Sequence, residues 1–316
     1  MNNVYLPDGL LIQSSQNREY ISSLSGLERA MNEGKILEST VTLCDSQMRL
    51  HVDLYGIEGI IEREEALYNQ GAPIKDIAVI TRVGKPVCFK VMSIQFEGGK
   101  PVAILSRRAA QLECMRQFVD KLSCGDIIRA RVSHLESFGA FVDIGCGVTS
   151  LCSVDCISVS RISHPSDRLT VGEYIYTVVK TKDAESGRIF VSMRELLGTW
   201  EENAALFEPG QTVAGVIRSV EDYGVFIELA PNLAGLAEIR EGSREKLMAS
   251  VGQRAAVYIK SIIPERMKIK LVLIDSYKGT PPQKELRYFI DTDNVTHIDR
   301  WQYSPSVSSK NVETIF

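Results

Sequence analysis

The most constraining feature of this sequence is a stretch that occurs twice. Residues 137–145 read SFGAFVDIG and residues 222–230 read DYGVFIELA, so aromatic, glycine, apolar and acidic positions follow in the same order. Flanking markers keep the same spacing: Gly125 corresponds to Gly210, and Leu151 to Leu236. After a five-residue slip, Arg188 and Ile189 correspond to Lys268 and Ile269. A repeat of this kind predicts two structural units with the same fold.

A third, weaker copy of the unit lies upstream. The segment 51–54 (HVDL) parallels 141–144 (FVDI), and the segment 59–60 (GI) parallels 150–151 (SL). This copy keeps the apolar alternation of the others but has lost their aromatic residues: Met48 and His51 stand at the places of Phe138 and Phe141. We therefore expect the first unit to share the fold and to lack the aromatic side chains.

Each copy contains short runs rich in Val, Ile, Phe and Tyr, separated by clusters of Gly, Asp and Ser. In the middle copy these runs are IIRARV, GAFVDI, YIYTVVKT and RIFVSM. Such runs predict strands, and a unit of about seventy residues built from them is close to a five-stranded barrel. The sequence thus predicts an all-β chain with three tandem barrels, at residues 34–107, 123–194 and 208–275.

The segments around the predicted barrels have another pattern. Residues 108–122 and 195–207 space their apolar side chains as a helix does, so we expect short helical linkers between the barrels. In the N-terminal segment, 1–33, a short helix is predicted over GLERAMNEG, ended by a glycine, and the polar stretch ahead of it is expected to be mobile. Downstream, KGTPPQ breaks the chain before the tail, 276–316.

The strand pattern predicts which side chains face the core. Successive side chains of a strand point to opposite faces, so Ala140, Val142 and Ile144 share one face while Phe141 and Asp143 share the other. The third unit repeats this pattern, with three aliphatic residues inward and Phe226 beside Glu228. We expect the aliphatic set to form the core and the other face to be solvated.

An aromatic side chain on a solvated strand face, placed there twice, indicates a function. A second aromatic, Phe138 or Tyr223, lies three residues earlier and is followed by a glycine that permits a bend. Two rings on one surface could serve as a stacking platform for unpaired bases. The alternative is that the rings only cover the barrel surface or pack on the linker helices.

Composition limits the kinds of partner. The chain has 36 Lys and Arg against 40 Asp and Glu, a formal net charge of -4, which excludes binding to nucleic acid through bulk positive charge. Contacts with phosphates would then come from a few placed cations, for which the candidates are Arg131, Lys180, Lys182, Arg188, Arg218, Lys260 and Lys268.

The remaining composition indicates a cytoplasmic protein without a metal or cofactor. The apolar runs are too short to span a membrane, and the first residues lack the pattern of a signal peptide. Seven scattered cysteines fit reduced thiols better than disulfides. The spacing of Cys146, Cys152 and Cys156 matches no common zinc pattern.

The sequence resembles the S1 RNA-binding motif, an oligonucleotide-binding (OB) barrel repeated in the bacterial small-subunit ribosomal protein of the same name. In the middle unit the resemblance rests on G125-DIIRARV, F138-GAFVDIG, Leu151 and the segment from Val171 to Met193. The unit from Gly210 to Leu273 is a second good match, and the unit from Gly34 to Arg107 a looser one. The resemblance covers residues 34–275.

The resemblance also implies residues of the RNA-binding face. In the family this face consists of two aromatics around the glycine, a histidine after the next turn, and an Asp/Arg pair that flanks the last hairpin. The histidine does not carry over, because Ser153 and Glu238 stand in its places. The positions that do carry over are Phe138, Phe141, Asp183 and Arg188 in the middle unit and Tyr223, Phe226 and Lys268 in the third.

The function that the sequence indicates is non-catalytic. No GxxxxGK[ST], HExxH or GxSxG motif is present, and the four histidines are dispersed, so an enzyme would require an active site completed by the tail. We expect a single-stranded RNA (mRNA) binding protein of translation, with 34–107 docked on the small ribosomal subunit. The alternative is a regulatory protein of RNA turnover or transcription that uses the same barrels without the ribosome.

Overall fold

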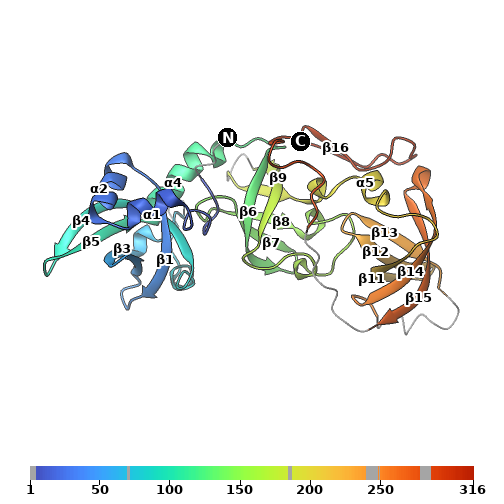
Figure 1. The fold of residues 1–316 in the computed structure, drawn as a ribbon, viewed down its shortest axis with the longest axis horizontal. Coiled ribbons are helices and arrows are strands. Elements are labelled where there is room, and N and C mark those ends of the chain that lie inside the picture. The colour runs from blue at the N-terminus through green and yellow to red at the C-terminus, as the bar shows by residue number, and fades with distance from the viewer. Residues whose placement is uncertain (1–4, 70–71, 184–186, 240–247, 249, 278–285) are drawn as a thin grey trace. The chain divides into compact units, whose positions relative to one another are not determined.

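The computed structural model describes residues 5–69, 72–183, 187–239, 248, 250–277 and 286–316 (Figure 1). Its strands form three five-stranded sheets, each closed into a barrel. The predicted fold class, tandem OB-like barrels with short helical linkers, is therefore confirmed. The chain divides into two compact units, one chiefly of residues up to 122 and one chiefly of residues from 123 onward. No helix within the described ranges is long and apolar enough to cross a membrane.

The first barrel has the strand order β1-β2-β3-β5-β4. Neighbouring strands are antiparallel except β3 and β5, which are parallel. Its core includes Leu50, Val52 and Leu54, the alternating aliphatic positions of the weak repeat copy. The elements are β1 (Leu37–Cys44), β2 (Leu50–Leu54), β3 (Ile57–Ile61), η1 (Arg63–Glu65), α3 (Asp76–Ile80), β4 (Pro86–Glu97) and β5 (Lys100–Ser106).

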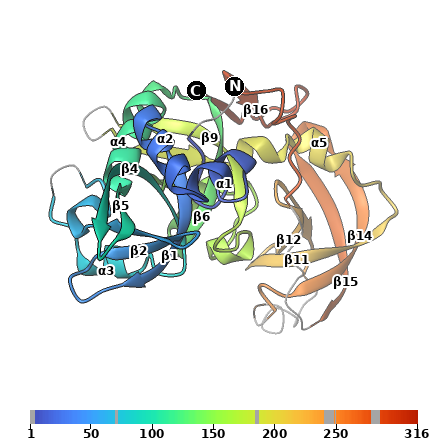
Figure 2. The ribbon, with the colours of Figure 1, turned by 60° about the vertical axis from the view of Figure 1, so that its left-hand side comes forward.

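Two helices precede the first barrel and pack against it (Figure 2). The predicted short helix is α2 (Leu24–Glu33), and it ends at Gly34, whose positive φ of 63° suits a residue without a side chain. The polar stretch ahead of it, expected to be mobile, instead forms α1 (Ser15–Ile21), because Ser14 caps its N-terminus and Tyr20 and Ile21 are buried in the barrel's core cluster.

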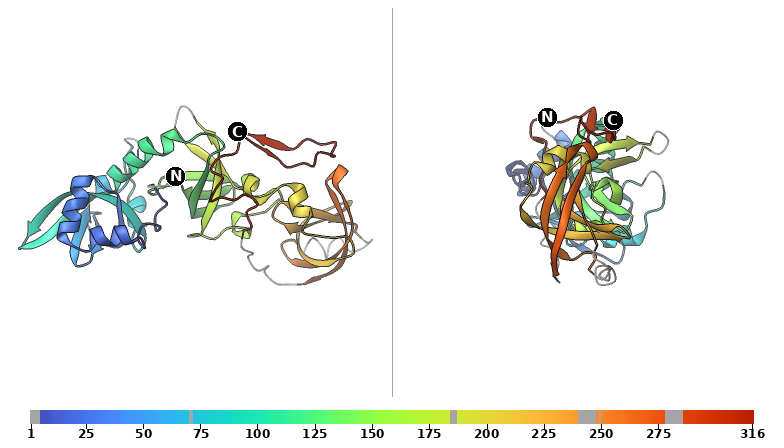
Figure 3. Two further views of the ribbon diagram at one scale, coloured as in Figure 1. Left: turned by 45° about the horizontal axis from the view of Figure 1, so that its top comes forward. Right: turned by 90° about the vertical axis from the view of Figure 1, so that its right-hand side faces the viewer.

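The linker after the first barrel begins with one continuous helix, α4 (Arg107–Gln117), followed by the turn η2 (Val119–Lys121) (Figure 3). The second barrel has the strand order β10-β8-β7-β6-β9. Its elements are β6 (Ile127–Glu136), β7 (Gly139–Asp143), β8 (Thr149–Ser153), η3 (Val154–Cys156), η4 (Pro165–Asp167), β9 (Tyr174–Lys182) and β10 (Ile189–Ser192).

The third barrel has the strand order β11-β12-β13-β15-β14. The linker that leads into it contains η5 (Arg194–Leu197) and α5 (Trp200–Ala204), which begins with a capping box at Thr199. The barrel elements are β11 (Thr212–Glu221), β12 (Gly224–Ala230), β13 (Leu233–Ala237), β14 (Arg254–Ile263), η6 (Pro264–Arg266) and β15 (Lys268–Tyr277). The breaker KGTPPQ lies outside the described residues.

The tail completes the packing of the third barrel. Its strands β16 (Arg300–Gln302) and β17 (Glu313–Ile315) pair with each other, and Trp301 and Tyr303 join the core cluster of the barrel. The Tyr303 hydroxyl donates to the carbonyl of Asn232 at 2.7 Å. The tail also reaches the second barrel, where the carbonyl of Thr296 accepts from Ile127 N at 2.9 Å. These contacts make residues 286–316 an integral part of the fold.

The predicted core positions are confirmed, but the predicted solvation of the opposite face is partly wrong. Ala140, Val142 and Ile144 are buried, as are Val225, Ile227 and Leu229. The acidic side chains on the other face are buried too: Asp143 and Glu228 are each 6% exposed. Other segments cover these two carboxylates and bind them, an arrangement that alternation along a single strand cannot reveal.

Candidate nucleic-acid interface

The two predicted aromatic pairs have nearly the same geometry. The rings of Phe138 and Phe141 lie 6.0 Å apart, centroid to centroid, with an interplanar angle of 89°. The rings of Tyr223 and Phe226 lie 6.2 Å apart, also at 89°. The first ring of each pair is well exposed, Phe138 by 53% and Tyr223 by 66%, and the second is half-buried. Edge-to-face packing covers one ring face at most, so each pair leaves π-surface accessible to a planar ligand.

Strand register shows which side chains share a face with the aromatic pair of the third barrel. Phe226 is paired with Ser219 on β11 and with Leu236 on β13. Leu236 is in turn paired with Lys270 on β15. Directly paired residues point to the same side of a sheet. Ser219, Phe226, Leu236 and Lys270 therefore form one line across four strands, which we call the outward row of the third barrel.

Lys268 belongs to the same surface. It lies two residues before Lys270 on β15, so the two side chains point to one face, and it is half-buried. Lys268 was predicted from the sequence and Lys270 was not, although the same alternation that placed Phe226 outward also places Lys270 there.

The outward row of the second barrel contains more rings. Repeat spacing places His134, Phe141, Leu151 and Phe190 where the third barrel has Ser219, Phe226, Leu236 and Lys270. His134 is exposed, and its ring lies 6.3 Å from that of Phe141 with nearly parallel planes, at 23°. Phe190 is paired with Leu151 on β8 and is 38% exposed. Neither Phe190 nor His134 was among the site residues predicted from the sequence.

The predicted Asp/Arg pair, Asp183 and Arg188, lies at the end of the hairpin of β9 and β10. The backbone N–H of Asp183 donates to the carbonyl of Arg188 at 2.8 Å, and both side chains are exposed. Residues 184–186 between them lie outside the described residues. Arg188 precedes Phe190 by two positions, so alternation places it on the side of the barrel that carries the outward row.

The buried acid on β12 holds the strand beside the aromatic pair. Arg168 donates to both carboxylate oxygens of Glu228, at 2.8 and 2.7 Å. Arg218 Nε donates to Glu228 Oε2 at 2.8 Å, and Arg218 Nη1 donates to Asp167 at 3.0 Å. Arg218 was expected to be available for a phosphate, and this is wrong, because two carboxylates already bind it. Bidentate charged hydrogen bonds fix Glu228, and thereby β12, in one position.

The buried acid on β7 has a different set of partners. The Asp143 carboxylate accepts from the backbone N–H of Asp8 at 2.7 Å and from those of Gly145 and Gly147 at 2.9 Å each. Asp8 is itself paired with the buried Arg107, at 2.8 Å. The acid that follows the aromatic position by two residues is thus an anchoring group in both repeat copies.

The seven cysteines carry free thiols. Lys180, one of the predicted phosphate contacts, directs its ammonium group at Cys156 Sγ, 2.9 Å away.

In the described part of the chain, no group of three or more His, Cys, Asp or Glu side chains could hold a metal ion. Burial raises the pKa of the Cys152 thiol well above its ordinary value.

The first barrel has the same row with different residues. Its register pairs Leu43 with His51, His51 with Ile60, and Ile60 with Ile104. Ile60 is buried and Leu43 is 52% exposed, and this row contains no Phe, Tyr or Trp ring on which a base could stack.

His51, at the position of the second aromatic, is held between two acids. Its Nδ1 lies 2.7 Å from Glu58 Oε1 and its Nε2 lies 3.2 Å from Asp45 Oδ2. Burial lowers the pKa of His51, but the two carboxylates outweigh it and the pKa lies above its ordinary value.

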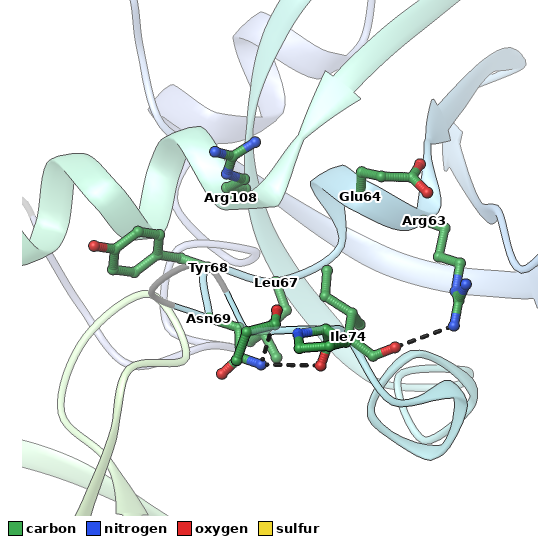
Figure 4. Close-up of a pocket in the computed structure, with 9 residues that line it drawn as sticks. Arg63, Glu64, Leu67, Tyr68, Asn69, Ile74 and Arg108 are labelled. Atoms are coloured by element: carbon green, nitrogen blue, oxygen red, sulfur yellow. Dashed lines mark hydrogen bonds between the residues drawn. The ribbon is translucent and has the colours of Figure 1, made fainter.

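A pocket of about 380 Å³ lies elsewhere on the first barrel (Figure 4). Its two cations are engaged with acids: Arg63 with Asp76 and Arg108 with Glu65. It contains none of the predicted site residues, and it lacks the exposed aromatic pair of the other barrels. The pocket therefore does not extend the candidate interface.

Known proteins resemble the chain in both sequence and domain type. Residues 121–194 match the S1 RNA binding domain. Small ribosomal subunit protein bS1 of Leuconostoc lactis is 32% identical over 192 residues, which cover 58% of this chain and 44% of that protein. The protein of the same name from Staphylococcus haemolyticus is 29% identical over 298 residues, which cover 91% of this chain and 72% of that one.

A crystal structure of a multidomain protein with nucleic acid binding domains from Streptococcus pneumoniae aligns with 79% of this chain and 76% of its own. Its sequence identity to this chain is 15% and its TM-score is 0.24. These matches show that the chain contains an S1 RNA binding domain at residues 121–194 and is distantly similar to the bacterial small ribosomal subunit protein bS1.

Proposed function

We propose that this chain is a non-catalytic cytoplasmic protein of translation that holds single-stranded mRNA on its second and third barrels. The observation that supports this proposal most strongly is the repeated aromatic pair, with ring separations of 6.0 and 6.2 Å and the same perpendicular geometry. An aromatic pair that served only to cover the barrel would not need to recur with the same spacing and exposure. Unpaired bases stack on such rings, at ~1–3 kcal/mol per base.

Cations on the same surface would bind the phosphate backbone. The candidates are Arg188 in the second barrel and Lys268 in the third, with Asp183 beside Arg188 as a polar contact to RNA. Because the described cations near the rings are few, we expect affinity to depend only moderately on salt, with a slope of about −0.7 per phosphate contacted.

We infer that residues 34–107 dock to a protein of the small ribosomal subunit. The first barrel keeps the apolar core positions Leu50, Val52 and Leu54, whereas its outward row has His51 bound by Asp45 and Glu58. Asp45 also binds Arg49, at 2.8 Å, so the charged groups around His51 are paired with one another and are poor contacts for a phosphate, and a protein surface is the better partner. The distant relationship to protein bS1, whose name places it in the small ribosomal subunit, supports this direction.

Removal of both aromatic pairs tests the RNA part of the proposal. The full chain with Phe138, Phe141, Tyr223 and Phe226 replaced by alanine should lose most of its affinity for a labelled oligouridine in fluorescence anisotropy. Its melting temperature should change little, because these rings are exposed or half-buried. Unchanged affinity in the folded variant, or equal affinity of the native chain for duplex and single strand, would rule out the stacking mechanism.

Co-sedimentation with small subunits tests the ribosomal part. The fourfold alanine variant should still sediment with small subunits that have been treated with ribonuclease to remove mRNA, at low and at moderate salt. Failure of the native chain to sediment with them would favour the alternative, a regulatory protein that acts in RNA turnover or transcription.

A further inference from the structure

The outward row of the second barrel contains a further aromatic residue, Phe190, which belongs to neither aromatic pair. Its neighbours on β10, Ile189 and Val191, are buried at 4% and 1% exposure, whereas Phe190 is 38% exposed. Alternation along the strand therefore turns the Phe190 ring away from the core. Phe190 is paired with Leu151 on one side and with Thr181 on the other.

The third barrel shows what lies between such a position and the aromatic pair. There Leu236 is paired both with Phe226 and with Lys270, so these three side chains stand side by side on one face. By the repeat, Leu151 corresponds to Leu236 and Phe190 to Lys270. Phe190 then lies two strands from Phe141, a distance of roughly 10 Å between Cα atoms, with the half-buried Leu151 between them.

Phe190 differs from an isolated apolar residue on the surface, because it adjoins the other residues of the outward row. Single exposed apolar side chains are common and need no explanation. Phe190, however, extends a surface that already holds His134, Phe141 and Leu151, and Arg188 precedes it by two positions on the same face. An aromatic ring beside a cation on a strand face suits one further nucleotide, with the base on the ring and the phosphate near the guanidinium.

We propose that Phe190 is a third stacking residue, so that the second barrel holds one base more than the third barrel does. In the third barrel Lys270 occupies this position and contacts a phosphate instead. The two barrels then bind the same single-stranded RNA by different means, the second more through stacking and the third more through charge. This inference rests on the proposed function.

Three single variants of the full chain test the proposal. The probe is a labelled oligouridine of about 30 nucleotides, enough to cover two barrels at ~4–16 nucleotides each. Phe190→Ala should weaken binding roughly five-fold or more, and Phe141→Ala should do the same. Phe96→Ala, which removes an exposed ring from the first barrel, should leave affinity unchanged and serves as the control.

The pattern of outcomes separates the two proposals. If Phe141→Ala weakens binding while Phe190→Ala does not, the role of Phe190 is overturned and the proposed function stands. If neither weakens binding, stacking on this barrel is overturned altogether. Ultraviolet crosslinking of the same oligouridine gives an independent measure, because a peptide crosslinked at Phe190 is expected, and crosslinks at Phe141 without any at Phe190 would contradict the proposal.

A reciprocal exchange tests the difference between the barrels. Phe190→Lys should weaken binding at moderate salt and steepen the dependence of log affinity on log salt by about 0.7, the contribution of one phosphate contact to single strands. Lys270→Phe should make that dependence shallower by a similar amount. Both positions are exposed on a strand face, so thermal melts should show folded variants. An unchanged salt dependence in both variants would overturn the proposed division between stacking and charge.

Discussion

The first and third barrels have corresponding strands in the same positions of the sheet. The side chains on their outer surfaces differ. Each is closed through one parallel pair, β3 with β5 and β13 with β15. Their second strands turn the same alternating positions inward: Leu50, Val52 and Leu54 in one, and Val225, Ile227 and Leu229 in the other. Their outward rows differ, with His51, Ile60 and Ile104 against Phe226, Leu236 and Lys270.

The core and the surface of such a barrel therefore change independently of each other. The inward positions need only volume and hydrophobicity, so a diverged copy can keep them while its surface acquires another role. The outward row carries no packing requirement of that kind. A copy that retains the core positions therefore retains the fold, and only its outward row indicates whether it can bind RNA.

The first and third barrels also differ in the burial of the acid that lies two residues after the aromatic position. In the third barrel Glu228 is buried and bound by Arg168 and Arg218. In the first barrel the corresponding Asp53 is exposed, and its carboxylate accepts a turn hydrogen bond from Gly56 N at 3.0 Å. The same sequence position thus anchors neighbouring segments in one barrel and closes a turn in the other.

Replacement of these two acids gives the largest expected contrast. Glu228→Ala leaves Arg168 and Arg218 without their shared carboxylate, and loss of one partner of a buried ion pair costs about 3–5 kcal/mol. Asp53→Ala should cost about 1 kcal/mol or less. Urea unfolding followed by tryptophan fluorescence reports on the third barrel, because both tryptophans, Trp200 and Trp301, lie in its core cluster. Hydrogen exchange of the β2 amides reports on Asp53→Ala. Similar losses in both variants would contradict the comparison.

The stability of the first barrel should depend on pH through one buried carboxyl group, Glu38. Burial raises the pKa of Glu38, on β1, from its ordinary value of 4.5 to about 7, although backbone N–H groups of Gly9 and Ile12 donate to its carboxylate. The folded state therefore binds this proton more tightly than the unfolded state. The free energy of unfolding should fall as pH rises from about 4.5 to about 7, by roughly 3 kcal/mol at 1.36 kcal/mol per pKa unit.

The variant Glu38→Gln, which cannot titrate, isolates this contribution. Hydrogen exchange of β1 amides at several pH values should show the fall in the native chain and a flatter profile in the variant. Parallel profiles in the two proteins would show that Glu38 does not titrate in this range.

The third contrast concerns RNA affinity. Phe226→Ala should weaken binding of a labelled oligouridine by ~1–3 kcal/mol, the value of one base stacked on an aromatic ring. His51→Ala, at the corresponding position of the first barrel, should leave the affinity unchanged, because His51 is engaged with Asp45 and Glu58. Anisotropy titrations measure both. A loss of affinity in His51→Ala would mean that the first barrel binds RNA, and the division of roles between the barrels would be wrong.

The sequence was sufficient for the fold and the aromatic pairs because both depend on local patterns. Alternation and repeat spacing placed Phe138, Phe141, Tyr223 and Phe226 on one type of surface, and the ring geometry agrees. The same alternation in RIFVSM would have placed Phe190 outward. That position was missed because the aromatic is absent from the other copies, where Lys270 and Ile104 stand.

The burial of Glu228 could not be predicted from local patterns. Its partner Arg168 lies 60 residues away in the chain, within a loop that contains the five-residue slip between the copies. Likewise, Trp301 and Tyr303 belong to a tail without repeat signal, yet they fill the core cluster of the third barrel. Both features depend on segments that meet only after folding, so neither strand alternation nor composition reveals them.

The smallest expected contrast lies in the salt dependence of binding. Lys268→Gln should reduce the slope of log affinity against log salt by about 0.7, because Lys268 shares its strand face with Lys270 and one phosphate contact to single-stranded RNA would be lost. Lys85→Gln, which removes an exposed lysine from the first barrel, should leave the slope unchanged. Oligouridine titrations at four or more salt concentrations measure both slopes. Equal reductions in the two variants would mean that the charge of the whole chain, rather than the outward row of the third barrel, sets the attraction to phosphate.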